Sequence, residues 1–196
     1  MSPELLRSLV WTDFRLAVLF CVLIPLGLLV WSVAKKAKSI THLLMIYWRV
    51  SSLLAITVYL LMDQNRVGFV TGFAALLLIP LSLWFWVDLN EEIEDRRGLL
   101  KLVFNAWRWA VTIYCIAAAA VQVPYLKCAG SKAALATAEC QAWLEPPRVY
   151  QTIFHASTKV EKLGFVAIIA LLLYGLYLAY FVLFKFSKQG RIATES

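Results

Sequence analysis

Charged residues make up only 16% of this 196-residue chain, and glycine, cysteine and histidine number eight, four and two. Because the two histidines, His42 and His155, are isolated, no cysteine–histidine spacing suits zinc and we expect no metal site. No glycine-rich phosphate loop and no nucleophile–base pair is present, so we expect no enzyme. No basic run is interleaved with aromatic residues, which argues against nucleic acid binding.

Apolar residues, by contrast, make up 62% of the chain, whereas soluble domains average about 45–50%. A helix that crosses a bilayer needs about 20 apolar residues, and five apolar runs account for most of the length. Only the segment 127–162 is left to fold outside the membrane. Since open strand edges cannot be satisfied in lipid, we expect an all-α integral membrane protein with five transmembrane helices in a single domain.

The five spans are predicted from these runs and from the polar residues that close them. They cover residues 14–34, 40–62, 69–89, 102–126 and 163–186, and residues 127–162 form an outer loop. Pro25 lies in the first run and Pro80 in the third. Proline inside a helix is expected to kink it.

Part of the chain resembles an internal repeat. The segment Leu23–Leu26 recurs 55 residues later as Leu78–Leu81, and at the same offset Trp31 matches Trp86. The spans would then form two tandem hairpins in the same orientation, followed by a fifth helix. Parallel repeats of this kind occur in transporters, but duplication of a structural hairpin gives the same pattern.

The distribution of positive charge predicts the orientation in the membrane. The side reached after the first span holds, in its short segments, Lys35, Lys36, Lys38, Arg96, Arg97, Lys101, Lys185, Lys188 and Arg191. The opposite short segments hold Arg7, Arg15 and Arg66. By the positive-inside rule the first side is cytoplasmic, so we expect the N-terminus outside, in a periplasm or lumen, and the C-terminus inside.

Two of the four cysteines lie in the outer loop. Because the outer side is oxidising in a bacterium, Cys128 and Cys140 are predicted to form a disulfide, with two unrelated thiols as the alternative. Cys21 and Cys115 lie inside spans and are interpreted as small apolar residues.

Two arginines lie inside apolar runs, Arg49 about 14 Å along the second span and Arg108 about 9 Å along the fourth. An isolated arginine at such a depth costs about 2.5–3.5 kcal/mol on insertion scales. Side chains of a helix tilt toward its N-terminus, so both guanidinium groups lean toward the cytoplasm. Asp88 ends the third span on that side, and we expect both arginines to share its carboxylate, with Asn105 one turn before Arg108.

Three interpretations of this buried charge cluster stay open. It fastens three spans together, it binds an anionic group such as a lipid headgroup or a partner's carboxylate, or it serves proton relay or transport. Glu91 and Glu92 are alternative partners for the arginines. Indole rings can stack on guanidinium and shield it from lipid, and the tryptophans near the cluster are Trp48, Trp84, Trp86, Trp107 and Trp109.

Six segments resemble an uncharacterised multi-pass membrane protein family of cyanobacteria, a domain of unknown function. They are Leu6–Asp13, Arg15–Phe20, Ile46–Val50, Ser82–Glu92, Trp107–Val111 and Lys188–Arg191. The similarity covers nearly the whole chain. It implies a setting, the thylakoid or plasma membrane, and no activity.

These patterns favour a non-catalytic accessory or assembly protein of a photosynthetic or other bioenergetic membrane complex. Aromatic-rich helical faces pack well against pigments and partner helices, so we expect other membrane subunits as partners. The sequence leaves the cofactor unknown, with lipid and pigment as the candidates. The alternative is a small transporter or an anionic-lipid-binding membrane protein that uses Arg49 and Arg108.

Overall fold

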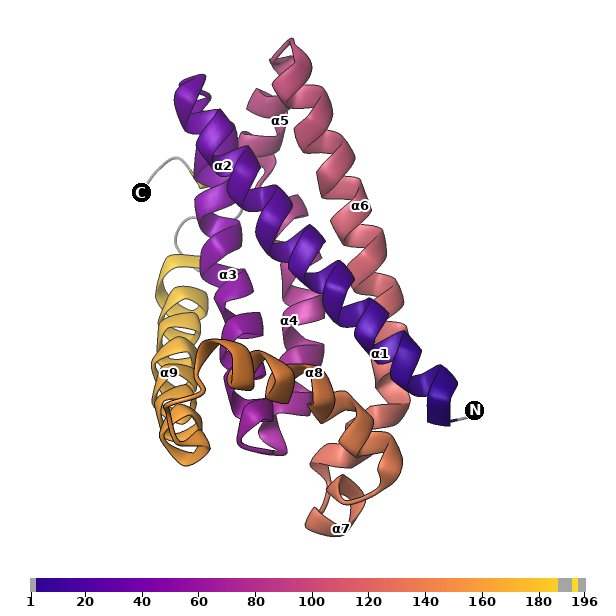
Figure 1. The fold of residues 1–196 in the computed structure, drawn as a ribbon. Helices are drawn as coiled ribbons and strands as arrows, with labels where there is room; N and C mark the ends of the chain where they lie inside the picture. The colour runs from indigo at the N-terminus through magenta and orange to yellow at the C-terminus, as the bar shows by residue number, and fades with distance from the viewer. Residues whose placement is uncertain (1–2, 187–191, 194–196) are drawn as a thin grey trace.

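In the computed structural model, which describes residues 3–186 and 192–193, every regular element is a helix (Figure 1). Five helices in this part of the chain are long and apolar enough to cross a membrane. The predicted all-α membrane fold is therefore confirmed. Lys188 and Arg191, which the sequence places among the cytoplasmic cations, lie outside the described residues.

The helices follow one another with short connections. Their bounds are α1 (Pro3–Val18), a π-helical turn (Leu19–Leu23), α2 (Ile24–Ala34), α3 (Lys38–Met62), α4 (Val67–Trp84), α5 (Val87–Asp95), α6 (Leu99–Gln122), a 3-10 helix (Val123–Ala129), α7 (Lys132–Leu135), α8 (Ala138–Phe154), α9 (Val160–Tyr180) and a second π-helical turn (Phe181–Phe186).

Helices α3 and α4 form an antiparallel pair at the centre of the bundle (Figure 1). Helices α6 and α1–α2 lie on one side of this pair, and α9 lies beside α3 on the other side. Helix α8 crosses one end of the bundle and contacts α1 and α3. The N-terminus and α7 lie at that end, whereas the α2–α3 turn and α5 lie at the opposite end.

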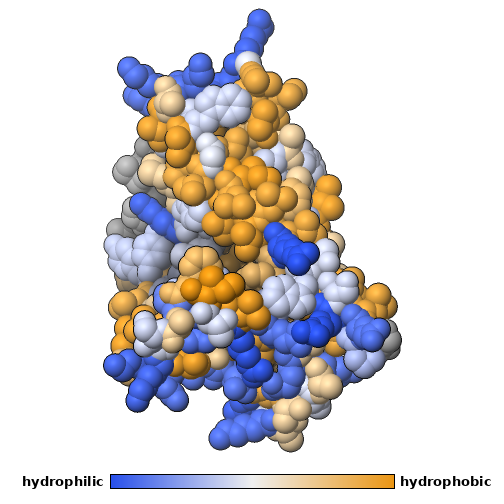
Figure 2. All heavy atoms as spheres, in the orientation of Figure 1, coloured by the Kyte–Doolittle hydropathy of each residue, from blue (hydrophilic) through white to orange (hydrophobic). Residues whose placement is uncertain are grey.

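The surface agrees with a membrane-spanning body. Apolar side chains gather over the middle of the molecule, and hydrophilic residues gather at its two ends (Figure 2). Helix α9 carries the most exposed apolar surface, because its packing contacts are chiefly with α3. Its exposed residues include Leu172, Leu173 and Leu176, as lipid-facing positions require.

Pro25 shapes the first crossing through its missing N–H. The Ile24 N–H bonds the Leu19 carbonyl in the π-helical turn, and Pro25 donates nothing, so the carbonyls of Phe20 and Cys21 lose their usual donors. The Trp107 indole N–H donates to Phe20 O at 2.8 Å, and Tyr47 Oη donates to Cys21 O at 2.8 Å. These side chains of α6 and α3 satisfy groups that lipid cannot.

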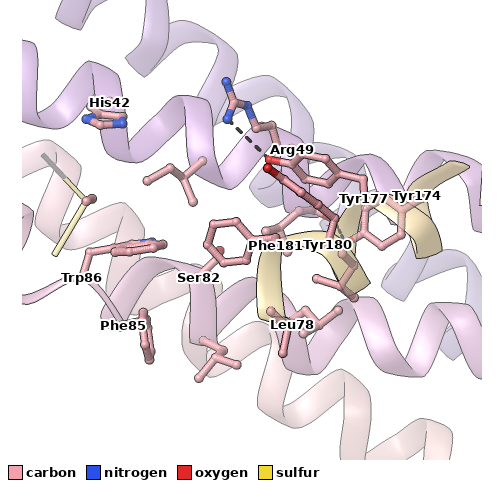
Figure 3. A pocket seen from close by; sticks show the side chains of 16 residues that line it. His42, Arg49, Leu78, Ser82, Phe85, Trp86, Tyr174, Tyr177, Tyr180 and Phe181 are labelled. Carbon is pink, nitrogen blue, oxygen red and sulfur yellow. Dashed lines mark hydrogen bonds between the residues drawn. The ribbon is translucent and has the colours of Figure 1, made fainter. Parts of the chain in front are cut away.

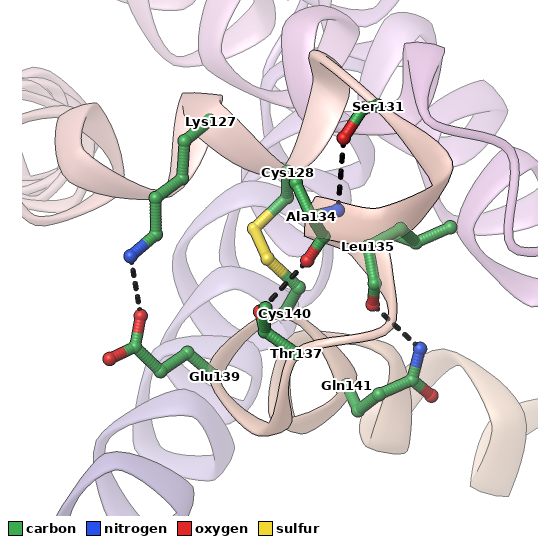
Figure 4. Close-up of a disulfide and its surroundings, with 9 residues drawn as sticks. All are labelled: Lys127, Cys128, Ser131, Ala134, Leu135, Thr137, Glu139, Cys140 and Gln141. Carbon is green, nitrogen blue, oxygen red and sulfur yellow. Dashed lines mark hydrogen bonds and ion pairs between the residues drawn. A yellow bond between two sulfur atoms is a disulfide. The ribbon is translucent and has the colours of Figure 1, made fainter.

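The cap at the α7–α8 end contains the expected cysteine pair (Figure 4). Cys128 and Cys140 form a disulfide with Cα atoms 5.8 Å apart, and Lys127 pairs with Glu139 at 2.6 Å beside it. Helix α8 is held to α1 by Arg7 Nε, which donates to Glu145 at 2.7 Å. The predicted outer loop is therefore a folded helical layer, in which the disulfide joins α8 to the 3-10 helix that follows α6.

Candidate functional site

Arg108 lies in the interior of the bundle, with only 3% of its surface exposed. Its Nη1 donates to Asn90 Oδ1 at 2.5 Å, and its guanidinium carbon lies 4.0 Å from the centroid of the Trp84 ring. An amide oxygen and an indole face therefore take the place of water around this cation. This environment fastens α4, α5 and α6 together at one point.

The structure differs from the expectation that Asp88 is shared between the two arginines. The predicted third span, 69–89, is interrupted: α4 ends at Trp84, Trp86 has an extended backbone (φ −83°, ψ 107°), and α5 begins at Val87. This change of direction brings Asn90 to Arg108. Asp88 Oδ2 instead accepts a hydrogen bond of 2.9 Å from the Ala193 backbone N–H.

Asn105 is also not bonded to Arg108, although it lies one turn before it on α6. Its Oδ1 and the Arg108 Nε are both buried, and neither has a hydrogen-bond partner among the described residues. The four predicted residues therefore do not form one cluster. Arg108 and Asn90 hold the interior, while Arg49 lies on another face of the bundle.

Arg49 is exposed on the face of α3 that looks toward α9. Its Nη1 donates to Tyr177 Oη at 3.5 Å, the long limit of a hydrogen bond. Neither ion pair within the described part of the chain involves it, since these join Arg7 to Glu145 and Lys127 to Glu139. Arg49 is thus an exposed cation within the long apolar helix α3, and it retains N–H donors for another molecule.

Arg49 forms part of a groove of about 450 Å³ between α3, α4 and α9 (Figure 3). Most of its wall is apolar or aromatic, and its polar side chains include His42, Arg49, Ser82 and the tyrosines of α9. The lining residues are His42, Ile46, Arg49, Val50, Leu78, Leu81, Ser82, Phe85, Trp86, Tyr174, Tyr177, Leu178, Tyr180, Phe181, Val182 and Ala193. A volume of this size and an apolar wall with few polar groups are typical of small-molecule sites.

The groove runs from the α2–α3 end of the bundle toward its middle. His42 and Arg49 lie on the same face of α3, about 10 Å apart along its axis. Figure 3 shows the Arg49 side chain extending toward the His42 end, as the tilt of helical side chains predicts. No acidic residue is among the described residues that line the groove, and the charged side chain among them is the cationic Arg49.

The tyrosines of α9 were not predicted as site residues. Tyr174 and Tyr177 are three residues apart and therefore share one face of the helix. Tyr174 Oη donates to the Val50 carbonyl at 3.4 Å, which fastens this face to α3. Regular spacing of tyrosines in an otherwise apolar span is the sequence signal that could have identified them.

Two carboxyl groups outside the spans have shifted pKa values. Burial, with the nearby Glu161 carboxylate as the second cause, raises the pKa of Asp63 at the α3–α4 turn. The hydrogen bond and charge of Lys127 lower the pKa of Glu139 in the cap. Among the described residues, no group of three or more His, Cys, Asp or Glu side chains is placed to hold a metal ion.

The fold and the groove define a multi-pass α-helical membrane protein with an apolar groove that contains a cationic side chain. The chain belongs to the family described as a protein of unknown function, DUF3177, whose family model matches residues 7–194. No curated protein and no solved structure matches the chain.

Proposed function

We propose that the protein is a non-catalytic membrane protein that binds an anionic amphiphile in the groove between α3, α4 and α9. We further propose that it does so as an accessory or assembly protein of a larger bioenergetic membrane complex. The observation that supports the first part best is Arg49, an exposed cation inside a span, at the wall of an apolar groove.

The physical argument begins with the cost of this charge. An arginine near the middle of a span costs about 2.5–3.5 kcal/mol on insertion scales unless a partner offsets it. The hydroxyl of Tyr177 is neutral and lies at the limit of hydrogen-bond distance. An anionic group in the groove would accept hydrogen bonds from the remaining N–H groups of Arg49. The apolar wall would cover the hydrocarbon part of the same molecule.

Mass spectrometry of lipids retained by detergent-purified protein tests this proposal. We expect Arg49→Gln to reduce retained lipid by at least about tenfold, because hydrogen bonds to charged groups contribute about 1.5–3 kcal/mol. Arg15→Gln is the matched control, since Arg15 is also an exposed arginine within a span but lies outside the groove. Equal lipid retention by Arg49→Gln and wild type would reject the site.

The accessory role is supported by α9, which lies at the edge of the bundle with most of its apolar surface exposed. In native membranes of a cyanobacterium, thylakoid or plasma, we expect the protein to migrate on native gels with partner subunits. Recovery of the protein alone, under detergent conditions that preserve known complexes, would contradict this role. Such an outcome would leave the lipid site untouched.

A further inference from the structure

The groove has a neighbouring hollow that carries most of the local positive charge. We propose that the two together bind one anionic phosphoglycerolipid, with its phosphate at Lys36, Lys38 and His42 and an acyl chain in the groove. This inference rests on the proposed function and names the chemical class of its ligand. It assigns a different part of the lipid to each part of the site.

The hollow lies at the start of α3 and has a volume of about 440 Å³. It is lined by Val33, Lys36, Lys38, Thr41, His42 and Met45. His42 lines both the hollow and the groove, so the two adjoin at this side chain. A headgroup in the hollow and a chain in the groove can therefore belong to one molecule.

The α2–α3 turn holds Lys36 in place at this hollow. Lys36 has a left-handed backbone (φ 50°), and the next N–H, of Ala37, bonds the Ser32 carbonyl at 2.9 Å to close α2. A residue with a Cβ pays about 1–2 kcal/mol for this conformation, in which glycine is usual. The turn thus presents a lysine where a helix end most often has no side chain.

Depth along α3 matches the parts of a glycerolipid. Arg49 lies about 16 Å from Lys38 along the helix axis, and its side chain tilts back toward Lys38. Headgroup layers extend about 5–7 Å beyond each face of the hydrocarbon core. With Lys38 among the headgroups, the Arg49 guanidinium lies just below them, where it can donate to the inner oxygens of the phosphate and to the ester carbonyls.

Charge favours an anionic headgroup over a zwitterionic one. No acidic residue is among the described residues that line either the hollow or the groove. A quaternary ammonium would therefore meet only cations and neutral groups. The hollow also lies on the side that the sequence predicts to be cytoplasmic, where lysine clusters attract anionic lipids.

Lipid exchange in nanodiscs tests the assignment. Wild type and variants would be placed in phosphatidylcholine discs with a minor fraction of phosphatidylglycerol, and bound lipid would be identified by native mass spectrometry. We expect wild type to enrich phosphatidylglycerol. The double variant Lys36→Gln/Lys38→Gln should weaken this preference by about thirtyfold, since each lysine near an anionic membrane surface strengthens binding roughly fivefold.

The control is Lys35→Gln, because Lys35 lies in the same turn but lines neither hollow nor groove. An equal loss of preference in Lys35→Gln would show a general surface effect and overturn the inference. If Arg49→Gln loses bound lipid while Lys36→Gln/Lys38→Gln keeps the wild-type preference, the groove site stands and the headgroup assignment falls. Retention of a fatty acid instead of a phospholipid would likewise support the groove site and overturn the headgroup assignment. Absence of any lipid from wild type defeats both proposals.

Discussion

At the scale of single residues, the buried arginines show where sequence reasoning succeeds and where it stops. The cost of charge in lipid identified Arg49 and Arg108 as residues that need partners. The partner of Arg108 is the Asn90 oxygen, not the Asp88 carboxylate. Asn90 lies beyond the predicted end of the third span, so its approach to Arg108 depends on a change of direction that depth along a continuous helix does not reveal.

Asn90→Leu should destabilise the protein, because it removes the oxygen bonded to a buried cation. We expect a loss of about 1.5–3 kcal/mol in unfolding free energy, measured by denaturation in detergent. Asn90→Asp should lower the unfolding free energy less, since a carboxylate oxygen also accepts a hydrogen bond from guanidinium. Glu91→Gln, on an exposed neighbour in α5, is the control. A neutral effect of Asn90→Leu would mean that water or another group satisfies Arg108.

At the scale of elements, the apolar runs predicted five long apolar helices, and the described part of the chain contains five such helices in the same order. The break between α4 and α5 was missed because no glycine or proline lies between Trp84 and Val87. Pro25 was expected to kink its helix. The structure has a π-helical turn just before Pro25, and two backbone carbonyls of this turn accept hydrogen bonds from side chains of α3 and α6. The donors come from distant parts of the chain, which local sequence cannot show.

The bond from Tyr47 to the Cys21 carbonyl can be tested by a double-mutant cycle. Tyr47→Phe should cost about 1–3 kcal/mol, because it leaves a buried carbonyl without a donor. In a Pro25→Ala background the restored N–H can bond Cys21 O, so the same change should cost clearly less. Equal costs in both backgrounds, measured by unfolding in detergent, would show that Pro25 does not create the need for Tyr47.

The start of α9 should hold α3 more tightly at low pH. Asp63 packs against Gly164, where an added Cβ would collide with its carboxylate, and burial beside Glu161 raises its pKa. The folded state therefore binds the proton more readily than the unfolded chain does. As pH rises from the ordinary pKa of 3.8 through the raised pKa of Asp63, the free energy of unfolding falls. Hydrogen exchange at residues 160–165 should show this change, and Asp63→Asn should abolish it. If Asp63→Asn kept the wild-type pH dependence, another titrating group would be its cause.

At the scale of the whole molecule, one end is a covalently closed cap and the other carries the basic turn. The Cys128–Cys140 disulfide closes the cap, and Lys35, Lys36 and Lys38 lie at the opposite end. The cysteine pairing was predictable because both residues lie in one short polar segment. The groove was not predictable from the sequence, because its walls come from three helices whose packing is set by the entire bundle.

This arrangement predicts that the cap faces an oxidising compartment. In native membranes treated with a thiol-alkylating reagent, Cys128 and Cys140 should become reactive only after reduction. Cys21 and Cys115, which are buried and free, should require unfolding rather than reduction. Alkylation of Cys128 and Cys140 without reductant would contradict the predicted orientation.

The central claim is that the groove between α3, α4 and α9 binds an anionic lipid, whose chain lies in the groove beside Arg49. The most direct test is an electron cryomicroscopy structure of the protein in lipid nanodiscs. We expect elongated density along the groove, with its polar end at His42 and its glycerol ester region beside Arg49. A groove closed by protein side chains, or an Arg49 guanidinium paired with Asp88, would contradict the claim.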